Sequence, residues 1–105
     1  MNCQLELRTS HLIIPPNLVE ELLDEYATVY VSYKKDLGAI LVSPKSNSWF
    51  PKLHESLELM VKNKDLHGTK SVSIREVLID HDIDSSDKMF SATINKEKRI
   101  LKIEL

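Results

Sequence analysis

The densest group of chemically active side chains is the acidic run Asp80-His-Asp-Ile-Asp-Ser-Ser-Asp87. Its carboxylates stand at alternate positions, like the oxygen ligands of a calcium-binding loop. Such a loop also needs glycine at its sixth position and glutamate at its twelfth, and this chain has Ser85 and Ser91 there. The run is therefore typical of a helix end and a turn, and we predict no calcium site.

Other reactive residue types also lack the neighbouring residues that a catalytic or metal site requires. The histidines show no zinc-ligand spacing and have no cysteine cluster beside them. No serine lies in a nucleophile-elbow sequence, the two glycines form no phosphate loop, and Cys3 has no second cysteine for an internal disulfide. The histidines are His11, His54, His67 and His81. We therefore predict no catalytic residue, metal or cofactor, no evident small-molecule ligand, and a protein that is not an enzyme.

Length and composition indicate a single folded domain over residues 1–105. Two separate cores of about 40 residues each would bury too little surface to be stable. Hydrophobic residues make up 42% of the chain and charged residues 29%, with a formal net charge of −2. There is no signal-like start and no long apolar run, so we expect a cytoplasmic protein that makes no membrane contact. Any contact with nucleic acid would need a local basic patch.

The chain contains an internal repeat, because residues 9–44 align with residues 69–104 at a constant offset of 60. The matches are mainly apolar positions in a shared order of elements. The identical pairs are Thr9/Thr69, Ile14/Ile74, Leu18/Leu78, Asp24/Asp84, Ile40/Ile100 and Leu41/Leu101. The repeat predicts one half over residues 1–44 and a second over 69–105, sharing one core.

Each half is expected to be α+β, with two strands or one, a short helix and a hairpin. In the first half, strands at 4–7 and 12–14 flank a polar turn, Pro15-Pro16-Asn17 begins a helix that ends near Asp24, and a hairpin follows. In the second half, the expected elements are a strand at 72–74, a helix at 77–83 and a hairpin. The predicted hairpins pair 28–33 with 39–42 and 89–94 with 100–103.

The register of the third strand is clear only in the first half, where Val29, Val31 and Tyr33 form its inward face. In the second half, either Phe90, Ala92 and Ile94 or the alternate residues beginning at Met89 could face the core. A slip of one residue would exchange the two faces.

The connection over residues 45–68 is predicted to be an amphipathic helix, because Leu53, Leu57, Met60 and Val61 follow helical spacing. Trp49 and Phe50 begin it. These rings either pack over the joined halves or form an exposed anchor at an interface with a partner.

The element order and two sequence stretches resemble the MraZ branch of the AbrB-like, swapped-hairpin transcription factors. One stretch is His11-Leu-Ile-Ile-Pro-Pro-Asn-Leu18; the other is Ala39-Ile-Leu-Val-Ser-Pro44, followed by Trp49 and Leu53. The resemblance covers nearly the whole chain. It implies two AbrB-like swapped-hairpin halves in one barrel, homo-oligomers that form rings, and DNA bound through basic residues of the strand-turn regions.

The resemblance places candidate DNA contacts near the turns, at Arg8, His11, Lys70 and Arg75. Lys34 and Lys35 in the first hairpin are further candidates, although hairpin lysines also serve to keep sheets from pairing with other chains.

The Asp-x-x-x-Arg pair of the family is replaced here by Leu7 and His11 and, in the second half, by His67 and Ser71. The sequence thus supports two hypotheses: an oligomeric DNA-binding regulator, or a degenerate relative that acts as a protein-interaction or scaffold module.

Overall fold

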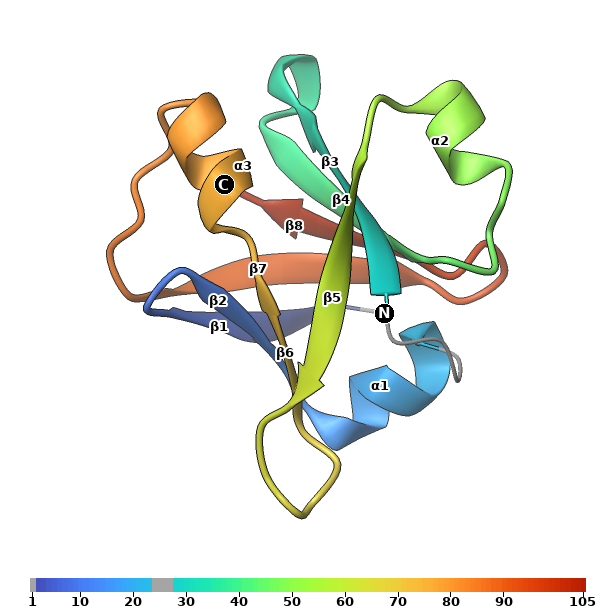
Figure 1. The fold of residues 1–105 in the computed structure, drawn as a ribbon, viewed down its shortest axis with the longest axis vertical. Helices are drawn as coiled ribbons and strands as arrows, with labels where there is room; N and C mark the ends of the chain where they lie inside the picture. Colours follow the sequence, from blue (N-terminus) through green and yellow to red (C-terminus); the bar gives the residue numbers. More distant parts are fainter. Residues whose placement is uncertain (1, 24–27) are drawn as a thin grey trace.

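The structure, a computed structural model, describes residues 2–23 and 28–105. It has a mixed α+β fold, as the sequence predicted, built on a closed barrel of eight antiparallel strands in the order β1-β2-β6-β5-β3-β4-β8-β7 (Figure 1). The strands are β1 (Asn2–Arg8), β2 (His11–Ile14), β3 (Thr28–Lys34), β4 (Ala39–Pro44), β5 (Leu57–Asn63), β6 (Lys70–Ser73), β7 (Lys88–Asn95) and β8 (Ile100–Glu104). The helices are α1 (Pro16–Leu22), η1 (Lys35–Leu37), α2 (Phe50–Leu53) and α3 (Arg75–Asp80).

The barrel is assembled from four hairpins that alternate between the first part of the chain (residues 1–44) and the second part (residues 45–105). The β1–β2 hairpin is followed around the barrel by β6–β5, then by β3–β4, then by β8–β7. Each hairpin therefore pairs on both sides with hairpins from the other part of the chain, through β2–β6, β5–β3, β4–β8 and β7–β1.

The pairing pattern has two-fold symmetry. Exchanging β1 with β5, β2 with β6, β3 with β7 and β4 with β8 leaves the strand order unchanged. The symmetry is centred on two pairs of facing residues, Leu12 with Val72 and Leu41 with Lys102. These pairs lie on opposite sides of the barrel, so the two-fold axis passes between β2 and β6 on one side and between β4 and β8 on the other.

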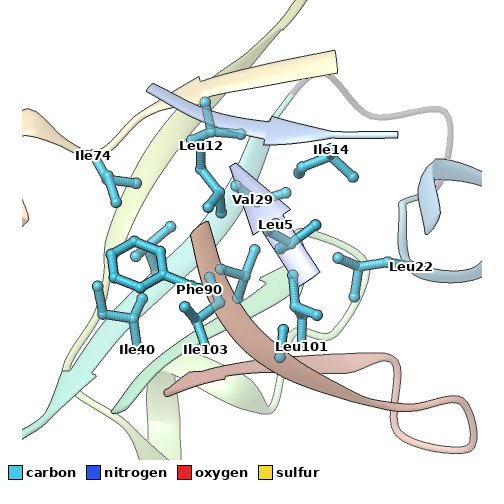
Figure 2. Close-up of a cluster of buried hydrophobic side chains, with 14 of the residues drawn as sticks. Leu5, Leu12, Ile14, Leu22, Val29, Ile40, Ile74, Phe90, Leu101 and Ile103 are labelled. Carbon is cyan, nitrogen blue, oxygen red and sulfur yellow. The ribbon is translucent and has the colours of Figure 1, made fainter. Parts of the chain in front are cut away.

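Alternate residues of every strand fill the interior. An eight-stranded barrel is just wide enough for side chains to pack across it, and Figure 2 shows such a cluster of aliphatic side chains together with Phe90. The labelled members are Leu5, Leu12, Ile14, Leu22, Val29, Ile40, Ile74, Phe90, Leu101 and Ile103. Because the cluster draws on strands from both parts of the chain, there is one shared core.

The structure decides the register that the sequence left open. Tyr33 of β3 packs against the core, as do Val29 and Val31, whereas in β7 it is Phe90 and its alternate neighbours that are buried. Met89 of β7 is 56% exposed. The inward residues of β7 thus match those of β3 at an offset of 61 residues, one more than the offset of 60 found in the sequence. The offset of 61 also holds for β4 and β8, where Ile40 and Leu101 point inward.

The predicted helix over residues 45–68 is wrong. Only Phe50–Leu53 is helical, and residues 57–63 form β5. Leu57, Leu59 and Val61 also alternate with period two, and this alternation prevails because β5 pairs with β3 and β6 and thereby closes the barrel. Met60, expected on the apolar side of the helix, is 63% exposed. The second part of the chain thus has a first strand that lies before residue 69.

Trp49 and Phe50 pack differently. Phe50 is fully buried on the outside of the barrel against Tyr30 and Leu41, and its ring lies 6.1 Å from that of Tyr30 in a stacked arrangement. Trp49 is half-buried, with its ring edge-on to Phe50. Phe50 therefore anchors α2 to this chain and is not available as an exposed anchor for a partner, because burial takes its ring out of reach.

Helices α1 and α3 lie toward opposite ends of the barrel (Figure 1). Each adds two buried side chains to the core, Leu18 and Leu22 from α1 and Val77 and Leu78 from α3. The expected end of the first helix near Asp24 lies outside the described residues. No helix in the described part of the chain is long and apolar enough to cross a membrane.

Replacing Leu12 by alanine should lower the free energy of unfolding by about 2–5 kcal/mol, because Leu12 is fully buried where the two parts of the chain meet and its removal leaves a cavity. Urea denaturation measures this. Met89→Ala, at an exposed position of β7, serves as the control and should cost less than about 0.5 kcal/mol. Equal losses in the two variants would contradict the assignment of the core.

Residues 1–44 and 45–105, produced as separate chains, should each be unfolded, since each carries hairpins whose neighbours are on the other fragment. Mixing them in equal amounts should restore β-sheet circular dichroism. A fragment that folds alone would contradict the interleaved pairing.

Candidate functional site

Four neighbouring strands, β1, β2, β6 and β5, present basic and hydroxyl side chains on their outer face. We call this face the two-fold wall, because the β2–β6 pair at its middle is one centre of the symmetry. Arg8, His11 and Lys64 line a shallow pocket of about 230 Å³ on it, with Ser71 beside them. Ser73 is paired with His11 across β2 and β6.

Arg8 and Lys62 occupy equivalent positions on the two-fold wall. Arg8 follows Leu7, which pairs with Leu12, and Lys62 follows Val61, which pairs with Val72. Leu12 and Val72 are themselves partners at the centre of symmetry, so the two cations flank it on opposite sides. Both are exposed.

Local hydrogen bonds orient the side chains on the Arg8 side of the wall. The Arg8 guanidinium donates through Nε to Oε2 of Glu6 at 2.8 Å and forms an ion pair with the same carboxylate. His11 Nδ1 lies 2.8 Å from the carbonyl oxygen of Thr9. A carbonyl only accepts hydrogen bonds, so Nδ1 is the donor and Nε2 remains for another partner.

The β1–β2 turn that carries these groups is held by the second part of the chain. Thr9 and Ser10 have φ angles of 50° and 61°, the left-handed geometry of a two-residue hairpin turn. The Thr9 amide donates to Oδ1 of Asp87 at 2.9 Å, and the Ile74 amide donates to the Ser10 carbonyl at 3.0 Å. These contacts with the second part of the chain stabilise a turn that has no glycine.

The acidic run is structural. The carboxylate of Asp84 accepts hydrogen bonds from Lys88 Nζ at 2.8 Å and from the amide and hydroxyl of Ser86, and these donors hold its pKa far below the usual range. Within the described residues, no three or more His, Cys, Asp or Glu side chains are grouped so that they could hold a metal ion.

The other predicted DNA contacts are dispersed. Arg75 begins α3 and lines a groove with Asp82 and Asp84, Lys70 donates to Asn63 at the far end of β6, and Lys34 and Lys35 lie at the β3–β4 connection. The structure thus brings together only Arg8 and His11 of the predicted set.

Sequence reasoning missed Lys62 and Lys64. They lie in and just after β5, a strand that the sequence analysis placed in a helix, and the period-two alternation of residues 57–61 is the signal that could have revealed them.

A second group of polar side chains lies where β3 ends. Ser32 Oγ donates to the Glu55 carbonyl at 2.6 Å, which ties the segment before β5 to β3. His54 packs its ring 4.8 Å from that of Phe50. Burial and, secondarily, the positive charge of Lys34 lower the pKa of His54 from its ordinary value.

Comparison of the chain with protein-family models, with curated proteins and with solved structures found no match.

The lowered pKa of His54 predicts a stability that depends on pH. The unfolded chain takes up a proton on this ring near the ordinary pKa of about 6.5, whereas the folded chain does so only at lower pH. The free energy of unfolding should therefore fall as the pH drops below about 6.5. Lys34→Gln should raise the pKa of His54, as measured by NMR titration of its ring, and should lessen the fall.

Lys35→Gln is the matched control, since it removes a neighbouring charge that is not a cause of the shift. A His54 pKa that is unchanged by Lys34→Gln would contradict the assignment.

Proposed function

We propose that this chain is a DNA-binding transcriptional regulator, similar to MraZ, that meets DNA phosphates with the two-fold wall. The observation that carries the proposal is the equivalent placement of Arg8 and Lys62 on either side of the Leu12–Val72 pair. A duplex has approximate two-fold axes of its own, and symmetric proteins commonly bind DNA with the axes aligned. Two cations related by such symmetry can contact equivalent phosphates of the two strands.

The chemistry of the wall supports phosphate contact. Between the two cations lie His11, Ser71 and Ser73, whose polar hydrogens are of the kinds that proteins direct at phosphate oxygens. Lys64 adds a third cation near Arg8. With a net charge of −2 over the whole chain, the attraction would be local and sensitive to salt.

The alternation of hairpins supports the finer part of the proposal, that the two parts of the chain are AbrB-like, swapped-hairpin halves. A duplicated half that exchanges hairpins with its copy accounts for the two-fold pairing pattern. Every barrel strand pairs on both sides within the one chain, so homo-oligomers would form through side-chain surfaces rather than strand addition. An oligomer would present several walls together and raise the effective affinity.

The alternative function is a protein-interaction or scaffold module without DNA binding. It is favoured by the Glu6 carboxylate, which neutralises Arg8, and by Met60, which is 63% exposed and follows the same outward alternation of β5 as Lys62. An exposed methionine suits an adaptable protein contact.

Charge reversal at both Arg8 and Lys62 should weaken DNA binding at least tenfold and reduce the salt dependence of log K by about 2, because about one counterion is released for each phosphate contact. Fluorescence anisotropy with a labelled duplex from the upstream region of the protein's own coding sequence, against a scrambled duplex, measures both at low and near-physiological salt.

The double variant Lys52→Glu/Lys98→Glu makes the same change of charge elsewhere and should retain binding; circular dichroism checks that both variants are folded. Unchanged affinity in the Arg8/Lys62 variant would exclude the two-fold wall. If the unaltered protein binds neither duplex at low salt, the interaction module is the better account.

A further inference from the structure

The barrel wall has an opening on the side of β3 that faces β5. The two strands pair only as far as Val31 with Leu57, while β3 continues to Lys34. A cavity of about 340 Å³ lies there, between the end of β3, the segment that precedes β5, and α3. It is lined by Val31, Tyr33, Lys34, Glu55, Ser56, Leu57, Val77, Asp80 and His81. Pockets that hold small molecules begin at about this size.

Charged side chains at this cavity lack ion-pair partners within the described part of the chain. Lys34, Glu55 and Asp80 line the cavity, and none of the three takes part in an ion pair among the described residues. Lys34 is half-buried at the end of β3. A cation in such a position suits a carboxylate.

The remaining lining residues supply the opposite charge and an apolar surface. Glu55 and Asp80 are carboxylates that line two sides of the cavity. Glu55 lies before β5, and Asp80 lies at the end of α3. The Tyr33 and His81 rings lie 4.5 Å apart at an angle of 45°. Val31, Leu57 and Val77 complete the lining. A ligand that matches the cavity carries both charges and an apolar group.

We propose that this cavity binds a small zwitterion, an α-amino acid with an aromatic or large aliphatic side chain. Its carboxylate contacts Lys34, its ammonium group contacts Asp80, and its side chain packs on Tyr33. Charge-assisted hydrogen bonds of this kind are among the strongest polar contacts available to a small ligand. The proposal does not depend on DNA binding.

The two-fold related position carries a different set of side chains on the same frame. Glu21 of α1 corresponds to His81 of α3 at the offset of 60, and Ile94 of β7 corresponds to Tyr33 at the offset of 61 that the third strands show. There Glu21 forms an ion pair with Lys96 at 3.1 Å. Among the described residues, the charged groups at the Tyr33 position form no such ion pair, which is the difference expected if one position of the pair is a binding site.

Three probes with the same phenyl ring and two-carbon link separate the contributions of the two charges. They are L-phenylalanine, 3-phenylpropionate, which lacks the ammonium group, and 2-phenylethylamine, which lacks the carboxylate. Each is titrated into the ¹⁵N-labelled protein and followed by amide NMR shifts. L-Phenylalanine should shift amides of residues around Tyr33, Ser56 and His81 at the lowest concentration, and its carboxylate should raise the pKa of His54.

Lys34→Gln and Asp80→Asn should each weaken L-phenylalanine binding about tenfold, the loss of one charge-assisted contact. Lys35→Gln, one residue away and not part of the lining, should have no effect. Binding of 3-phenylpropionate as tight as that of L-phenylalanine would overturn the zwitterion assignment. The absence of any localised amide shift with the three probes at about 10 mM would overturn the site itself.

Discussion

The interleaving of the four hairpins is the constraint on which the rest of this structure depends. The two edge strands of each hairpin pair only with hairpins from the other part of the chain. These pairs are β2–β6, β4–β8, β5–β3 and β7–β1. Isolated hairpins are marginal in water, so the barrel must form from both parts together. The shared interior follows from the same constraint, because aliphatic side chains from both parts meet inside the closed barrel.

The same interleaving brings turns of one part against helices of the other. The Thr9–Ser10 turn is held by Asp87 and by the amide of Ile74, just before α3. In the other direction, Gly68 after β5 lies close to Pro16 of α1, where an added Cβ would be 3.6 Å from that ring. The outer face of β1, β2, β6 and β5 is consequently supported from both parts of the chain, and a rigid face is the kind that can present separated charges at a fixed spacing.

Symmetry of pairing does not extend to the side chains. One symmetric position holds the Glu21–Lys96 ion pair, whereas its counterpart holds the Tyr33–His81 ring contact beside an open cavity. Similarly, Arg8 forms an ion pair with Glu6, while its counterpart Lys62 forms none among the described residues. A duplicated frame can thus carry two unlike surfaces, because strand pairing depends on the backbone and on inward residues, and leaves outward residues free to differ.

The sequence by itself determined the α+β class, most strands, both principal helices and the single core, because apolar periodicity and proline or polar turns act over a few residues. It also named Arg8 and His11 as candidates, and the structure places these two side by side. Tertiary structure decided what local signals leave ambiguous. Residues 57–61 satisfy a helical and an alternating pattern equally, and only pairing with β3 and β6 selects the strand. The inward face of β7, the proximity of Lys64 to Arg8, and the meeting of Lys34 with Asp80 at one cavity all depend on contacts between residues distant in the chain, which no local pattern encodes.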